Sequence, residues 1–166
     1  MQEHTLFERL IGTTPDASHA ARSVILIRLL VSFVFVTEGI QKFLYPAALG
    51  IGRFVTIGIP APELTAPFIG VVEIVFGTCI LVGLLSRVSA VWLIADISVA
   101  IATTKVPLLL QKGFWAMSHE ARTDLSMFLS LVFLLIVGSG DYSLDRFLTA
   151  RHQSKRQSAP PASIAG

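Results

Sequence analysis

Long apolar stretches alternate with short polar ones along this 166-residue chain. Four stretches approach the roughly 20 residues that a helix needs to cross the hydrocarbon core of a bilayer. They are residues 24–45, 66–85, 88–110 and 123–140. A buried helix of a soluble bundle would show a polar face every few residues, whereas 24–37 contains only Arg28, Ser32 and Thr37 among aliphatic and phenylalanine side chains. The pattern therefore predicts an all-α integral membrane four-helix bundle.

The polar stretches divide the chain into three parts. Residues 1–23 carry no apolar run and are expected to form a cytoplasmic N-terminal segment. Residues 24–148 form the predicted transmembrane domain, and 149–166, rich in Ser, Pro, Ala, Lys and Arg, are expected to be a disordered tail. Between the first two helices, 46–65 combines proline and glycine with apolar residues, which predicts a short interfacial loop containing an amphipathic turn.

Composition and charge support a membrane protein whose partner is the lipid bilayer. Hydrophobic residues make up 53% of the chain and charged residues 14%, against about a quarter charged in soluble domains. Basic residues cluster only at Arg151, Lys155 and Arg156, which excludes a nucleic-acid-binding face. Lys and Arg are more frequent around the two termini and the turn at 86–87 than in the opposite loops, which predicts cytoplasmic termini.

The inventory of metal ligands and thiols narrows the redox chemistry open to this chain. A single cysteine, Cys79, supplies neither an internal dithiol nor an iron–sulfur site, and we expect it to serve in packing. The four histidines lie outside the apolar runs or at their ends, where they are poorly placed to ligate an intramembrane haem. We therefore expect no metal centre. If this chain itself carries electrons, it must do so through a bound organic cofactor such as a quinone.

Ionisable residues within the apolar runs are the candidate functional residues, because a charge near the bilayer centre must be paired or hydrated. Counting 1.5 Å per residue from the expected helix ends predicts two polar centres. The outer centre contains Glu38, Gln41, Lys42, Glu73, Lys105 and Asp124. The inner centre contains Arg28 and Asp96; alternatively, Arg28 extends to the cytoplasmic interface and Asp96 bonds a neighbouring hydroxyl such as that of Ser98.

Two interpretations of the outer centre stay open. In the first, Glu38 and Lys42 form a structural ion pair one helical turn apart, and Glu73 only bonds across the bundle. In the second, these side chains line a wet pocket that binds a polar head group or passes protons.

Small residues on the second helix are expected to let helices approach closely in lipid. They are Gly70, Gly77 and Gly83.

An ordered series of short motifs between Arg28 and Asp145 resembles the DoxX family of small four-span membrane proteins. No single motif is specific, and the resemblance depends on their order along four apolar segments. After Arg28 the series includes Gly39 to Lys42, Pro46, Gly58-Ile59-Pro60, Glu73, Gly83, Arg87 and the closing stretch from Gly138 to Asp145. The chain departs from the family pattern at Asp141, where an arginine is common.

This resemblance implies a protein of the bacterial plasma membrane. Some similar proteins are associated with redox chemistry, such as the DoxD-type subunit of thiosulfate:quinone oxidoreductase. We accordingly expect a redox-associated, quinone-interacting membrane subunit, enzymatic only as part of an oxidoreductase whose other subunit is soluble or membrane-bound. The alternative is a small transporter or structural membrane partner without catalytic activity, which as a transporter would form a homo-oligomer to enclose a path.

Overall fold

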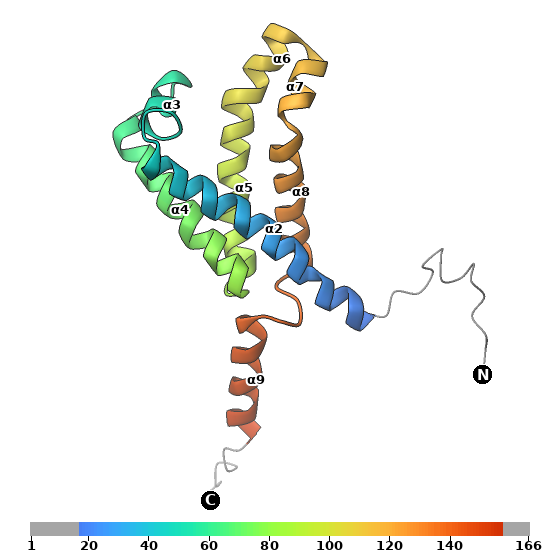
Figure 1. Cartoon of the computed structure of the whole chain (residues 1–166). Helices are drawn as coiled ribbons and strands as arrows, with labels where there is room; N and C mark the ends of the chain where they lie inside the picture. The colour runs from blue at the N-terminus through green and yellow to red at the C-terminus, as the bar shows by residue number, and fades with distance from the viewer. Residues whose placement is uncertain (1–16, 158–166) are drawn as a thin grey trace, which may run out of the picture.

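The computed structural model describes residues 17–157, and their side chains over 21–150. Every regular element in this part of the chain is helical (Figure 1). In chain order the elements are α2 (Ala17–Leu44), α3 (Ile51–Thr56), α4 (Pro62–Val82), α5 (Ser86–Ala100), the π-helical segment η1 (Ile101–Lys105), α6 (Val106–Lys112), α7 (Phe114–Glu120), α8 (Arg122–Val137) and α9 (Leu144–Gln157). The prediction of an all-α membrane bundle is confirmed.

Three stretches of the described chain are long and apolar enough to cross a membrane. They are Ala21–Leu44, Pro62–Val82 and Ser86–Lys112, the last of which joins α5, η1 and α6. The fourth predicted span forms α8, whose 16 residues extend about 24 Å. It is shorter than predicted because Gly138, at φ +85°, ends the helix.

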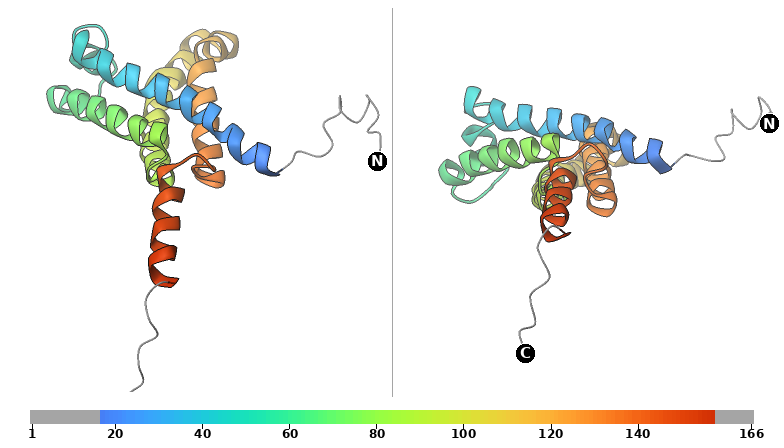
Figure 2. Two further views of the ribbon diagram at one scale, coloured as in Figure 1. Left: turned by 60° about the horizontal axis from the view of Figure 1, so that its bottom comes forward. Right: turned by 90° about the horizontal axis from the view of Figure 1, so that it is seen from below.

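The helices form two pairs that diverge. Figures 1 and 2 show α2 beside α4 and α5 beside α8, with the pairs meeting near the start of α5 and separating toward the end that carries α3, α6 and α7. We call that end the α6–α7 end and the opposite one the α9 end, because α9 extends away from the bundle there (Figure 1). The predicted interfacial segment between the first two spans contains α3, with Phe54 buried.

A mainly apolar core fills the bundle where the pairs meet. Side chains from four helices are fully buried there. They are Val31 of α2, Ile80 of α4, Leu93 of α5, and Leu131 and Leu134 of α8. Because lipid is as apolar as these side chains, close packing rather than escape from water stabilises the contact.

Glycines let α2 and α4 approach closely. A Cβ on Gly70 would lie 2.7 Å from the ring of Phe43, and one on Gly77 would lie 2.9 Å from Cγ2 of Val36. Gly83 differs, since it ends α4 at φ +71° and its Cβ would lie 2.8 Å from the Arg28 guanidinium. Two of the three predicted packing glycines therefore lie at the helix interface, and the third terminates a helix.

The guanidinium of Arg28 closes the α9 end of the bundle. Its side chain is buried, and its Nε donates to the carbonyl of Ile80 at 2.8 Å. Nη2 donates to the carbonyl of Leu81 at 2.5 Å, and Nη1 to those of Ser139, at 3.1 Å, and Tyr142. One side chain of α2 thereby holds the C-terminus of α4 to the loop that follows α8.

Asp145 completes this closure from the first turn of α9. Its carboxylate accepts the backbone N–H of Leu85 at 2.9 Å and that of Ser86 at 3.4 Å, which caps the N-terminus of α5. Its own N–H donates to the carbonyl of Gly83 at 3.1 Å. Residues of the stretch from Gly138 to Asp145 thus hold the helices together at this end of the bundle.

The ends of the chain depart from the predicted boundaries. Helix α2 begins at Ala17, inside the segment assigned to 1–23, and α9 continues to Gln157, so 149–157 are helical rather than disordered. The polar composition of 149–157 concealed this helix, because its sequence lacks the apolar run that marks the others. Residues 1–16 and 158–166 lie outside the described part of the chain.

Candidate functional site

A cavity of about 490 Å³ lies between the diverging helix pairs. Its walls come from α2, α3, α4, α5, η1 and α8 and include the apolar side chains of Phe68, Val72 and Trp92. Trp92 is stacked on Phe76, with ring centroids 5.8 Å apart. Six charged residues also line the cavity. They are Glu38, Lys42, Arg53, Glu73, Asp96 and Asp124.

The strongest polar contact in the cavity joins α2 to α4. Lys42 Nζ lies 2.8 Å from Oε1 and 2.6 Å from Oε2 of Glu73, and both side chains are nearly buried. Glu38, one turn before Lys42, lies 4.0 Å from the same ammonium but is 53% exposed. Lys42 is therefore paired more closely with the carboxylate across the helix interface than with the one on its own helix.

Asp96 of α5 belongs to this cluster and not to Arg28. It lines the same cavity as Glu73 and Lys42 and interacts electrostatically with both of them. The predicted inner centre of Arg28 and Asp96 is wrong, because the guanidinium donates four hydrogen bonds to backbone carbonyls at the α9 end, whereas Asp96 lines the cavity with Glu73 and Lys42.

Helix ends explain this difference. Glu73 lies nine residues before the end of α4 at Val82, and Asp96 lies ten residues after the start of α5 at Ser86. At 1.5 Å per residue both are about 14 to 15 Å from the α9 end. The prediction started the second helix at Ala66 rather than Pro62, and so placed Glu73 too close to the opposite end.

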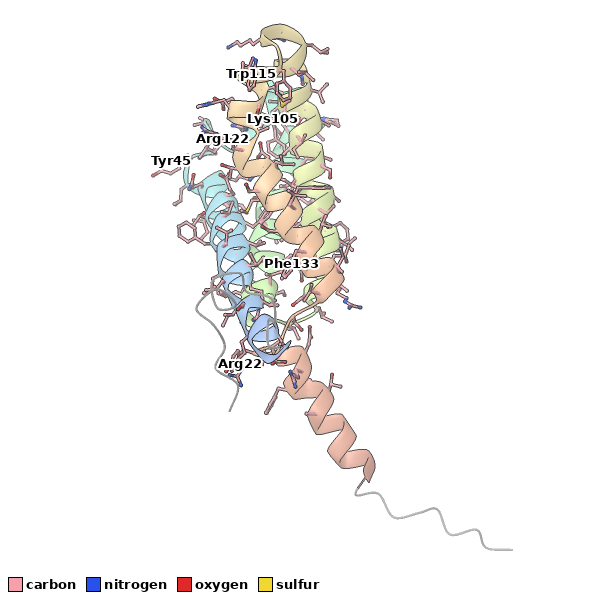
Figure 3. All side chains as sticks on the ribbon, turned by 90° about the vertical axis from the view of Figure 1, so that its right-hand side faces the viewer. Arg22, Tyr45, Lys105, Trp115, Arg122 and Phe133 are labelled. Carbon is pink, nitrogen blue, oxygen red and sulfur yellow. The ribbon has the colours of Figure 1, made fainter. Side chains whose placement is uncertain are left out.

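Lys105 and Asp124 form a separate ion pair, with Nζ and Oδ2 3.0 Å apart, between η1 and α8. Asp124 lines the cavity, whereas Lys105 is not among the lining residues and lies toward the α6–α7 end (Figure 3). Gln41, the remaining predicted member of the outer centre, is not among the cavity-lining residues. The structure thus divides the predicted outer centre into a cluster around Lys42 and a pair at the cavity rim.

Two features of the site were not predicted from the sequence. Arg53 reaches the cavity from α3, and among the described residues its side chain has no ion pair or hydrogen bond. The π-helical segment η1 brings Thr103 and Thr104 into the cavity wall. An arginine in the apolar, glycine-rich loop was a usable signal for the first, whereas nothing in the local sequence marks the π-helical turn.

The arrangement suits an amphipathic ligand. Aliphatic and aromatic walls lead to a cluster in which one ammonium donates hydrogen bonds to the carboxylate of Glu73, and the carboxyls of Glu38 and Asp96 line the same cavity. We call the residues Glu38, Lys42, Glu73 and Asp96 the polar cluster. Apolar cavities with a few convergent polar groups are the usual form of small-molecule sites.

Comparison with known proteins places this arrangement in a family. The DoxX family model matches residues 23–106, a stretch that contains the whole polar cluster. The chain is also 57% identical over 135 residues to the uncharacterized membrane protein Rv3486 of Mycobacterium tuberculosis (strain ATCC 25618 / H37Rv). That match covers 78% of this chain and 83% of the mycobacterial protein. No solved structure matches the chain.

Proposed function

Because the chain belongs to the DoxX family of membrane proteins, we propose that it is a redox-associated subunit of the bacterial plasma membrane that binds a quinone in its cavity. The observation that carries this proposal is the polar cluster, which lies within an otherwise apolar cavity. Its termini are proposed to be cytoplasmic, which places the α6–α7 end on the outer side of the membrane.

The side chains present match the chemistry of a quinone. A quinone carries carbonyl oxygens that accept hydrogen bonds, a flat ring and an apolar tail. Lys42 supplies a donor, and the carboxyls of Glu73 and Asp96 supply groups that can take or give a proton within reach of the same oxygen. Phe68 and Trp92, both about half exposed, line the apolar part of the cavity and offer surfaces for a ring or tail.

The residues of this chain act by binding and proton exchange. A bound quinone supplies two-electron carrier chemistry. The chain, which has only one cysteine, leaves electron delivery to a separate oxidoreductase partner. Lys42 holds the head group by donating a hydrogen bond, while Glu73 and Asp96 stand beside it as proton donor or acceptor.

A binding measurement tests this proposal. The purified protein in lipid nanodiscs is titrated with a short-tailed menaquinone analogue, with an isoprenoid alcohol of equal tail length as the control ligand. We expect saturable quinone binding that Lys42→Met weakens at least tenfold, while Lys112→Met, at the end of α6, leaves it unchanged. Equal affinity for the alcohol, or unchanged quinone binding by the Lys42 variant, would contradict the proposal.

A further inference from the structure

The polar cluster is closed off from the α9 end. Between it and that end lie the fully buried side chains of Val31, Ile80 and Leu93, followed by the four hydrogen bonds of Arg28 to backbone carbonyls. The buried hydroxyls of Ser32 and Ser89 also lie in this layer, but neither has a hydrogen-bond partner in the described part of the chain, so they do not connect the cluster to the α9 end by a chain of hydrogen bonds. The described residues therefore provide no continuous hydrogen-bonded route from the cluster to the α9 side.

Toward the α6–α7 end the same cluster opens in steps. The side chain of Glu73 is 6% exposed, that of Lys42 11% and that of Glu38 53%. These three groups contact one another in that order, and the helix pairs that carry the cavity walls separate in this direction (Figure 1). The exposure gradient defines a polar path from the buried carboxyls to the α6–α7 side.

The charges of the cluster do not balance. Glu38, Glu73 and Asp96 bring three carboxyls against the one ammonium of Lys42. The other two charged residues that line the cavity, Arg53 and Asp124, do not belong to the cluster. Asp124 of α8 is paired with Lys105 of η1, and the exposed Arg53 of α3 lies at the edge.

Surplus carboxylates in an apolar cavity are costly, and a proton removes the cost. The carboxyls of Glu73 and Asp96 line the same cavity and interact electrostatically, so one proton shared between them removes their repulsion. The geometry therefore provides both a place for a proton and a single direction by which it can leave.

We propose that the polar cluster is a proton-binding site that exchanges protons only with the α6–α7 side of the membrane, with Glu38 as the group at the exit. The bound proton lies between the carboxyls of Glu73 and Asp96 and leaves by way of Glu38 and water, so that no other atom is transferred. This inference rests on the proposed function only for the reaction that consumes or supplies the protons. That the protons exchange with one side of the membrane follows from the packing and exposure of the side chains.

Carbodiimide labelling tests proton occupancy. Dicyclohexylcarbodiimide adds to a protonated carboxyl in an apolar site and leaves a stable N-acylurea on it, which mass spectrometry of the peptides locates. At neutral pH we expect labelling of the folded protein at Glu73 or Asp96, but not at Glu63 in the first turn of α4. Glu73→Gln should reduce labelling of the cluster at least fivefold, and Glu63→Gln should not. Absence of label from both Glu73 and Asp96 at neutral pH would overturn the proposal.

Cysteine accessibility tests the sidedness. In a Cys79→Ser background, Thr103→Cys places a thiol in the cavity wall, and Lys112→Cys and Thr149→Cys mark the α6–α7 and α9 ends. A membrane-impermeant maleimide applied to sealed vesicles of each orientation should label Thr103→Cys only where it labels Lys112→Cys. Ser89→Cys, at a fully buried position, is the unlabelled control.

Labelling of Thr103→Cys from the α9 side, from both sides or from neither would overturn the one-sided exit. These outcomes are independent of quinone binding. A protein that holds a proton and labels from one side but binds no quinone would refute the proposed function alone. One that binds quinone but labels from both sides would refute only this inference.

Discussion

Replacing Arg28 should destabilise the bundle more than any change at an exposed arginine. The guanidinium makes four hydrogen bonds to backbone carbonyls of α4 and of the loop after α8. Removing one partner of a buried hydrogen bond costs about 1–3 kcal/mol, and here four carbonyls lose their donor, of which those in part-buried bonds can turn to water. We expect Arg28→Met to lower the free energy of unfolding by about 3–5 kcal/mol.

Arg28→Lys separates the charge from its geometry. An ammonium keeps the charge but cannot reach carbonyls on two sides as the planar guanidinium does, so we expect about half of that loss. Unfolding by SDS titration in mixed micelles, followed by circular dichroism, measures both variants. Arg22→Met, on an exposed arginine near the start of α2, is the control and should change the free energy by less than about 0.5 kcal/mol. A loss below about 1 kcal/mol for Arg28→Met would refute the closing role.

Three other predictions use the same unfolding assay. Gly77→Leu should cost about 1–3 kcal/mol because even its Cβ would lie 2.9 Å from Val36, and unchanged stability would mean that α2 and α4 pack less closely. Lys42→Met leaves the carboxylate of Glu73 unpaired, so it should destabilise more than Lys42→Met combined with Glu73→Gln; the opposite order would contradict the buried pair. Asp145→Ala removes the cap of α5 and should cost about 1 kcal/mol, whereas no loss would show that the cap is dispensable.

The hydrophobic pattern was sufficient to predict the helices but not their ends. The second predicted helix was placed four residues late, because Pro62 to Thr65 look like loop although proline is favoured in the first turn of a helix. Because of that shift, Glu73 and Asp96 were predicted at different depths in the membrane, and Asp96 was assigned to the depth of Arg28 instead. An error of one helical turn therefore changed the membership of the polar cluster.

Residues whose partners are backbone groups were the least predictable. An arginine in an apolar helix suggests a carboxylate partner, whereas Arg28 binds four carbonyls that carry no side-chain signal. Glu38 and Lys42 were recognised from their spacing, yet the shorter contact of Lys42 is to Glu73 on another helix. Spacing along one helix identifies what can pair, and the packing of two helices decides which pair forms.

The most direct test of the central claim is to locate a quinone on the protein. A photoreactive menaquinone analogue, with its azide on the ring, is irradiated with the protein in nanodiscs, and the modified peptides are identified by mass spectrometry. We expect modification of cavity-lining residues of α4 and α5 near Glu73 and Asp96, suppressed by excess unmodified quinone and by Lys42→Met. Modification confined to the α9 end, or spread over the lipid-facing surface without competition, would contradict it.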